Sequence, residues 1–410
     1  MKRPWRRPAR AYPLEHQILL TATLCLMAGG AVMVYSASSA RTLLEGTGDG
    51  STYLVKYLMY GAVGLVLMQI MARRGLELAQ RFGPIALVVS FALLVAVKLP
   101  GLGVEVNGAR RWLGAGPLQF QPSEIMKLSL VFYAASLLAG KPRRLQTLKG
   151  IVRPLLLVAG AAALLIASQP DLGTALVIGF TMCAMLVAAG VPMRHLGTLG
   201  ACVAGLIFLF ALLEPYRRAR LTSFLDPWAH ASDAGFQAVQ GQIALGSGGM
   251  FGLGPGQSVQ KIFYLPEAHT DFILAVIGEE LGVMGISCLL FLYGMIAYAG
   301  LRTAKAAKGV YAKLLAAGLT SLILCQALLN VYAVLGLAPL TGVPLPFISS
   351  GSTSLIVLLA SMGLLLNIAG GGSAHLKALE GKRDRARRDR SGGNGGARRP
   401  GDRGRGRAAG

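Results

Sequence analysis

The sequence contains little charge and few aromatic residues for its length. Only 14% of the 410 residues are charged and 7% are aromatic, whereas 54% are hydrophobic. Several uncharged apolar runs reach about 20 residues, the length that an α-helix needs to cross about 30 Å of hydrocarbon. The composition therefore excludes an ordinary water-soluble globular protein and predicts a polytopic membrane protein.

The sequence also lacks the motifs of several catalytic classes. It contains no HExxH, CxxC or GxSxG pattern, so zinc-dependent hydrolysis and a serine triad have no support. The glycine-rich stretch 246–252 follows no expected strand and opens no expected helix, which argues against a nucleotide loop. The cysteines are odd in number and lie in apolar runs, so we expect small core residues rather than disulfides: Cys25, Cys183, Cys202, Cys288 and Cys325.

What the chain has instead is a succession of apolar runs. We expect an all-α fold of about ten transmembrane helices, near 17–37, 54–72, 83–98, 122–140, 150–168, 171–189, 194–214, 271–300, 311–336 and 349–369. The first run follows basic residues but is longer than the apolar core of a signal peptide, so we interpret it as a retained helix.

The distribution of basic residues predicts the orientation. The net charge is +22, and placing the N-terminus in the cytoplasm puts 30 of the 40 Lys and Arg residues on the cytoplasmic side. Both termini are then cytoplasmic, and a large loop, 215–270, lies outside between the seventh and eighth helices. The positive charge is explained by topology, so no nucleic-acid partner is expected.

Three regions follow from this organisation. Residues 1–16 form a basic cytoplasmic N-tail and residues 17–369 the transmembrane domain. Residues 370–410 are rich in Gly and Arg, which predicts a disordered basic C-tail that either binds anionic lipid or docks cytoplasmic partners. In the outer loop, Phe236, Val239 and Ile243 recur at helical spacing and predict a short amphipathic helix.

Polar motifs gather where the even-numbered helices begin, at the outer face. Helix N-termini carry unpaired N–H groups and a partial positive charge, so several of them together suit a phosphate or pyrophosphate. Alternatively, Ser123, Asp171 and Asp271 are simple helix caps. Both interpretations stay open from the pattern alone. The motifs are 121–124, 169–171, 270–271 and 349–352.

Four charged or polar residues lie at or near these helix starts. Glu124 and Lys127 share one helix face, so they either neutralise each other or, because Lys127 lies within a span, serve function. Arg111, next to Trp112, could clamp phosphate oxygens or anchor the loop at the interface. His269 is a lone imidazole at an interface, a pattern that gives weak support for a metal ligand.

A series of motifs occurs in a fixed order along the chain: WLG at 112–114, QPSE at 121–124, QPDLGT at 169–174, YLPEAHTDF at 264–272, GEELG at 278–282 and PLPFIS at 344–349. With these motifs, roughly residues 15–370 resemble the SEDS family, the bacterial proteins of shape, elongation, division and sporulation. The stretch 264–272 resembles the division members more than the elongation members. The stretch 349–354 departs from the family, which usually has paired glycines there.

The resemblance implies a peptidoglycan glycosyltransferase that polymerises lipid II into β-1,4 glycan strands at the outer face of a bacterial cytoplasmic membrane, during septal wall synthesis, and releases undecaprenyl pyrophosphate. Asp271 falls on the family's essential aspartate and is the expected general base. The residues expected to bind substrate or pyrophosphate are Lys127, Glu124, Arg111, Asp171, His269, Ser349 and Ser350.

The resemblance also implies partners and leaves alternatives. The expected partners are lipid II, the growing glycan strand, a class B penicillin-binding protein and other division proteins. No cofactor is required by the sequence, although a divalent cation, Mg²⁺ or Mn²⁺, could bridge Asp271 and pyrophosphate. A lipid II flippase or a non-catalytic scaffold for a penicillin-binding protein are the rival functions. Polar motifs at the membrane boundary, rather than at mid-depth, favour the enzyme over a carrier.

Overall fold

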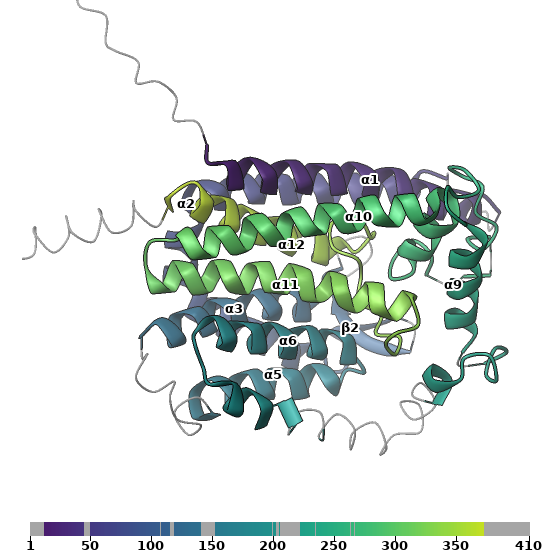
Figure 1. Cartoon of the computed structure of the whole chain (residues 1–410). Coiled ribbons are helices and arrows are strands. Elements are labelled where there is room, and N and C mark those ends of the chain that lie inside the picture. Colours follow the sequence, from purple (N-terminus) through teal and green to yellow (C-terminus); the bar gives the residue numbers. More distant parts are fainter. Residues whose placement is uncertain are drawn as a thin grey trace, which may run out of the picture.

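The computed structural model describes residues 12–372 except for 45–49, 107, 115–118, 141–151, 199, 202–204, 206–221, 234, 263 and 266. Most of the predicted N-tail and C-tail therefore lies outside the described residues. The chain forms a bundle of helices that run side by side (Figure 1). Its elements are α1 (Leu14–Leu44), α2 (Thr52–Ala96), β1 (Gly103–Val106), β2 (Ala109–Leu113), α3 (Pro122–Gly140), the π-helical turn η2 (Val152–Leu156), α5 (Leu157–Ala167), α6 (Leu172–Ala188), α9 (Phe236–Ser247), α10 (Ile273–Ala306), α11 (Val310–Val334) and α12 (Ser352–Ala369).

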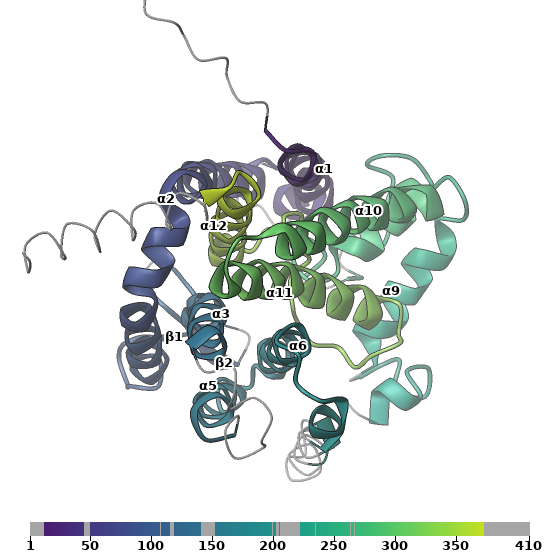
Figure 2. The same cartoon turned by 60° about the vertical axis from the view of Figure 1, so that its left-hand side comes forward.

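The two spans expected at 54–72 and 83–98 belong to one continuous helix, α2. A straight helix of 45 residues would be about 68 Å long, more than twice the hydrocarbon thickness. The helix instead bends, since its first part packs along α12 and its last part along α3 (Figure 2). Pro84 lies within α2 and removes one backbone hydrogen bond of the helix. One helix therefore contains both of the expected spans.

Six helices in the described part of the chain are long and apolar enough to cross a membrane: α1, α2, α3, α10, α11 and α12. Two shorter apolar helices occupy the expected spans 150–168 and 171–189, and most of 194–214 lies outside the described residues. The prediction of an all-α fold is wrong in one place. β1 and β2 form an antiparallel hairpin before α3, so the fold is mostly helical.

The centre of the bundle is formed by α11 and α12. Most of their side chains are buried, and α11 lies among α3, α6, α10 and α12 (Figure 2). A helix that is apolar on all sides needs such a position. The outer helices expose apolar side chains such as Val66 and Phe291, which hydrocarbon would cover. Cys25, Cys183 and Cys288 are also exposed, so the expectation that they are core residues is wrong, although they are free thiols as expected.

Close contact between α2 and α12 depends on a small residue. A Cβ atom added at Gly363 would lie 2.3 Å from the carbonyl oxygen of Met68, a distance that no real side chain tolerates. Small residues let helix backbones approach closely in membrane proteins, where van der Waals contact replaces the hydrophobic effect as the driving force. The glycine therefore sets the distance between the two helices.

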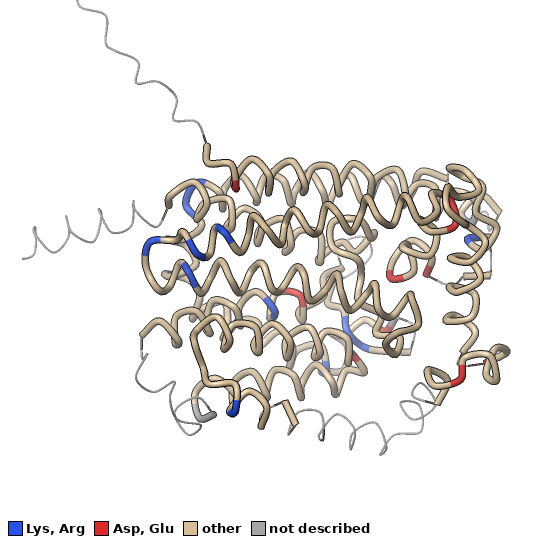
Figure 3. Tube along the Cα trace, viewed as in Figure 1, with Lys and Arg blue, Asp and Glu red and all other residues tan. Residues whose placement is uncertain are grey.

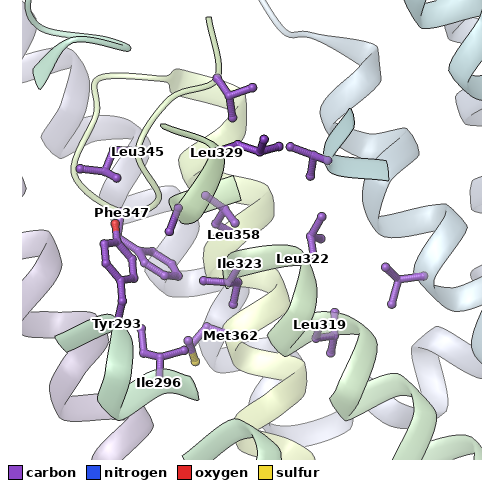
Figure 4. Close-up of a cluster of buried hydrophobic side chains, with 14 of the residues drawn as sticks. Tyr293, Ile296, Leu319, Leu322, Ile323, Leu329, Leu345, Phe347, Leu358 and Met362 are labelled. Carbon is purple, nitrogen blue, oxygen red and sulfur yellow. The ribbon is translucent and has the colours of Figure 1, made fainter. Parts of the chain in front are cut away.

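The connection between α11 and α12 includes an irregular segment, residues 343–349, that is largely buried inside the bundle. Irregular backbone at membrane depth needs partners for its carbonyl groups. The hydroxyl of Tyr293 donates to the carbonyl of Pro346 at 2.6 Å, and that of Tyr57 donates to the carbonyl of Phe347 at 2.5 Å. The rings of Tyr293 and Phe347 lie side by side among buried aliphatic side chains (Figure 4). Two tyrosines thus fix this segment from α10 and α2.

The start of α1 and the end of α12 lie at the same end of the bundle (Figure 1). Arg302 near the end of α10 forms an ion pair with Glu15 at 3.3 Å, which places the end of α10 there as well. Lys and Arg residues gather mainly at this end, and most acidic residues lie toward the opposite end (Figure 3). The described part of the chain therefore enters and leaves the bundle on one side, the side richer in positive charge.

Candidate functional site

Four helices begin close together at the end of the bundle opposite to that basic end. The main-chain N–H of Gln121, before α3, donates to the hydroxyl of Thr353 in α12 at 3.1 Å. The side-chain amide of Gln121 donates to Asp171, before α6, at 3.0 Å. The N–H of Ser350, before α12, donates to the carbonyl of His269, before α10, at 3.1 Å. We call this region the site end. It contains the four polar motifs that the sequence predicted to converge.

Asp171 is a helix cap in this structure. It is the N-cap residue of α6, and its Oδ1 accepts a hydrogen bond from the N–H of Thr174 at 3.1 Å. Its Oδ2 accepts from Gln121 and, at 3.4 Å, from the hydroxyl of Ser123. The carboxylate therefore satisfies donors of α6 and ties α6 to α3. Of the two roles left open for Asp171, the structure favours capping.

Arg111 is held by main-chain carbonyls at the end of α5. Its Nε donates to the carbonyl of Gln169 at 2.9 Å, and a terminal nitrogen donates to the carbonyl of Pro170. The neighbouring Arg110 differs, because it forms an exposed ion pair with Glu105 across the hairpin at 3.2 Å. The guanidinium of Arg111 therefore lies beside the start of α6. Its partners in these two bonds are carbonyl groups, which do not neutralise its charge.

Glu124 and Lys127 form a buried ion pair one turn into α3. Lys127 Nζ lies 2.8 Å from Glu124 Oε1, and both side chains are at most 3% exposed. Lys127 also donates to Oε1 of Gln326 in α11 at 2.7 Å. Burying two charges is costly unless they are paired, and charges inside a membrane domain are usually functional. Oε2 of Glu124 has no hydrogen-bond partner within the described residues.

Asp271 is not the cap of its helix. α10 begins at Ile273, and its N-cap is Phe272, which makes no side-chain capping bond. Oδ1 of Asp271 accepts from the hydroxyl of Thr270 at 3.2 Å, and the side chain is only half-buried. A Cβ atom added at Gly342 would lie 3.7 Å from Oδ2. The carboxylate therefore faces the connection between α11 and α12, and a capping role does not explain its position.

The main chain just before Asp271 is held by two serines. The hydroxyl of Ser349 donates to the carbonyl of Thr270 and accepts from the N–H of Leu345 at 2.8 Å. The hydroxyl of Ser350 donates to the carbonyl of His269 at 2.9 Å. The imidazole of His269 packs against Tyr53, with ring centroids 4.1 Å apart. In this structure Ser349 and Ser350 fix the backbone that carries Asp271.

The segment that precedes α10 is joined to this helix by two acidic residues. The carboxylate of Glu279 accepts from the hydroxyl of Ser258 at 2.5 Å and from the N–H of Val259 at 2.9 Å. Glu280 forms a buried ion pair with Lys261 at 2.8 Å and accepts from Ser36 of α1. The helix expected in this loop is present as α9; Val239 of the predicted apolar face is buried, whereas Ile243 is exposed. Glu279 and Glu280 therefore hold the segment leading to Asp271.

Two polar residues of the site end were missed from the sequence. Gln326 binds Lys127, and Asn330 donates to the carbonyl oxygen of Asp271 at 2.7 Å. Their signal was available, because an amide inside an apolar span is as unusual as a charge there. The sequence prediction relied on helix starts, and Gln326 and Asn330 lie inside α11 instead.

The donor set at Asp271 is poor for a resident metal ion. Within the described residues no three His, Cys, Asp or Glu side chains are grouped so that they could hold a metal ion. A divalent cation at Asp271 would need oxygen atoms of another molecule to complete its coordination.

Comparison with known proteins gives a consistent result. The model of the FtsW/RodA/SpoVE family, described as cell cycle protein, matches residues 16–372. Stage V sporulation protein E of Bacillus subtilis is 38% identical over 353 residues, which cover 86% of this chain and 96% of that protein. A protein of Coxiella burnetii named probable peptidoglycan glycosyltransferase FtsW is 40% identical over 356 residues, covering 86% and 95%.

Solved structures resemble the fold as well. One similar chain comes from a structure described as "Structural coordination of polymerization and crosslinking by a peptidoglycan synthase complex". The two chains are 30% identical and superpose with a TM-score of 0.72, and the match covers 88% of this chain and 98% of the other. The rod shape determining protein RodA of Thermus thermophilus has a TM-score of 0.61 and 28% identity, with the same coverage.

Proposed function

Because the chain belongs to the FtsW/RodA/SpoVE family of cell cycle proteins, the SEDS family, we propose that it is a peptidoglycan glycosyltransferase that polymerises lipid II. The observation that carries the proposal is Asp271, a half-buried carboxylate that precedes the N-cap residue of α10 and lies where four helix starts meet. An acid in that position is costly near hydrocarbon and requires a function.

Asp271 is the proposed general base. A sugar hydroxyl of the acceptor attacks the anomeric carbon of the donor, the new C–O bond forms as the bond to pyrophosphate breaks, and Asp271 takes the hydroxyl proton. The donor is α-linked and the product β-linked, so one displacement with inversion suffices and needs a single base. The hydroxyl of Thr270 donates to Oδ1 of the carboxylate, and Oδ2 lies toward the connection between α11 and α12.

The leaving group is undecaprenyl pyrophosphate, which departs with its negative charge and needs electrostatic stabilisation. The starts of α3, α6, α10 and α12 and the guanidinium of Arg111 supply positive potential at the site end. Lys127 is the proposed second cation. Its side chain is 2% exposed, so direct contact with the pyrophosphate would require α3 and α11 to part locally. Glu124 holds the ammonium group, and Asp171, His269, Ser349 and Ser350 shape the surrounding backbone.

We propose that the chain crosses the membrane ten times and that α2 provides two of these crossings. An even number of crossings agrees with a chain that enters and leaves the bundle at the same end. The basic character of that end supports cytoplasmic placement of both termini, of residues 1–16 and of residues 370–410 (Figure 3). The site end and the loop 215–270 then face outward from the cytoplasmic membrane, where lipid II is polymerised.

The proposed partner is a class B penicillin-binding protein, which would cross-link the strands made here. Similarity to a chain of a peptidoglycan synthase complex supports such a pairing, and relatives named FtsW support a role in septal wall synthesis with other division proteins. The acceptor is the growing glycan strand.

Purified protein supplied with lipid II, with and without a class B penicillin-binding protein, tests the proposal. The wild-type protein should make glycan polymer, and Asp271→Asn, which keeps the shape of the side chain, should lose about 100-fold or more of that activity. Asp233→Asn, which removes an exposed outer-loop carboxylate, is the matched control and should polymerise normally. Normal polymer from Asp271→Asn would refute the assigned base. Lipid II movement across liposomes without any polymer would favour a carrier.

A further inference from the structure

Helix α11 carries two buried amides in a largely apolar sequence. Gln326 is fully buried and Asn330 is 2% exposed. The two residues are four positions apart, so they lie on the same face of the helix, one turn above the other. That face contacts Lys127 of α3 and the main chain at Asp271. An amide buried at membrane depth is costly unless its donors and acceptors are used, so the bonds of both residues indicate what they are for.

The contacts of Gln326 fix the direction of its amide. Its Nε2 donates to the carbonyl of Pro344 at 3.0 Å and to the hydroxyl of Ser354 at 3.2 Å. The nitrogen must face these acceptors, so the oxygen must face Lys127, which donates to it at 2.7 Å. Gln326 therefore holds the ammonium group of Lys127 against α11.

Asn330 makes the equivalent contacts one turn further along. Both hydrogens of its Nδ2 are used, one on the carbonyl of Asp271 at 2.7 Å and one on the carbonyl of Val343 at 2.8 Å. Its Oδ1 is buried and has no partner within the described residues. Burying an acceptor without a protein partner costs about 1–3 kcal/mol, so the two bonds of Nδ2 have to offset that cost.

The two amides thus connect the base and the cation through one rigid element. Asn330 holds the backbone of Asp271, Gln326 holds the head of Lys127, and the same two side chains bind consecutive carbonyls, those of Val343 and Pro344. We propose that Gln326 and Asn330 are positioning residues that fix the separation of Asp271 and Lys127 for glycosyl transfer. This inference rests on the proposed function.

A purely structural role makes a different prediction. If the amides only satisfied buried carbonyls, their loss would lower the yield of folded protein and leave the turnover of each folded molecule unchanged. If they position the base and the cation, the folded variants turn over slowly while binding lipid II normally. A displacement of about 1 Å in a catalytic group can cost about 100-fold in rate.

The experiment compares Asn330→Ala and Gln326→Met with Tyr293→Phe. All three delete a side-chain donor to the segment 343–349, but Tyr293 contacts neither Asp271 nor Lys127 in the bonds described. Each variant is purified as a monodisperse species, and kcat and KM for lipid II are measured per folded molecule. We expect kcat to fall about 100-fold for the two α11 variants with KM within about threefold of wild type, and Tyr293→Phe to keep wild-type kcat.

The outcomes separate this inference from the proposed function. An inactive wild-type protein would refute the function itself. An active wild-type protein with normal kcat in both α11 variants would refute the positioning role and leave the function standing. An equal fall in kcat for Tyr293→Phe would also overturn it, because integrity of the segment would then be sufficient. If Asn330→Ala does not fold, Asn330→Asp keeps the volume and removes donors, and it should show the same fall in kcat.

Discussion

The buried pair of Glu124 and Lys127 allows stability and catalysis to be separated by mutation. Replacing Glu124 alone with Leu leaves the Lys127 ammonium buried, with Gln326 as its remaining partner among the bonds described. Breaking a buried ion pair in this way costs about 3–5 kcal/mol, because an uncompensated charge stays in a medium of low dielectric constant. Glu124→Leu should therefore unfold at a clearly lower temperature than wild type and should have low activity.

The double variant Glu124→Leu/Lys127→Met should behave differently. It removes both charges, and replacing a buried pair with apolar residues of similar volume is often neutral or stabilising by about 1–4 kcal/mol. The amide oxygen of Gln326 then loses its donor, at about 1–3 kcal/mol. These effects nearly cancel, so the stability should return close to that of wild type. The polymerase activity should stay lost, because the proposed cation is gone.

Thermal unfolding in detergent and a lipid II polymerisation assay measure the two properties on the same samples. The expected result is a double variant that is stable and inactive, beside a single variant that is unstable. Recovery of polymerisation in the double variant would show that the pair is only structural. A single variant as stable as wild type would contradict the burial and pairing of Lys127.

Two further predictions concern the junction of the outer loop with α10. Glu280→Ala should leave Lys261 buried without its carboxylate partner, which costs about 3–5 kcal/mol of folding free energy. Limited proteolysis should therefore cut the loop 248–262 faster than in wild type. The control Asp233→Asn should be cut at the wild-type rate. Gly282→Ala should also loosen this junction, because an added Cβ would lie 2.4 Å from the nitrogen of Gly252. Gly282 has φ +66° and ψ −163°, a conformation that is essentially limited to glycine and costs another residue about 1–3 kcal/mol. An unchanged cleavage rate in either variant would contradict the described packing.

Much of the fold could be predicted from the sequence because hydropathy dominates in a membrane protein. Apolar runs located the helices, and the amphipathic spacing of Phe236 and Val239 located α9. The prediction that 54–72 and 83–98 are separate helices missed the continuous backbone of α2, since hydropathy reports crossings and not the hydrogen bonds between them. The β1–β2 hairpin was not predicted, because strands of four and five residues are too short to show a clear alternation of polar and apolar residues.

The candidate site was predicted only in part. The four polar helix starts were visible because capping residues and prolines mark such positions in sequence. Whether each residue is a cap was not visible, because Asp171 and Asp271 look alike in sequence and differ only in where their helices begin. Ser349 and Ser350 were expected to bind substrate, and in the structure their hydroxyls hold the main chain at His269 and Thr270, which leaves a substrate contact as a prediction.

The sequence by itself determined that this chain is a helical membrane protein with polar motifs at one boundary, since burial in hydrocarbon leaves a backbone few alternatives to the helix. Only the tertiary structure decided which of those motifs are caps and which is a candidate base. It also brought Gln326 and Asn330 of α11 to Lys127 and Asp271, residues up to about 200 positions away. Such contacts depend on how helices pack, and the packing of apolar surfaces leaves no local pattern in the sequence.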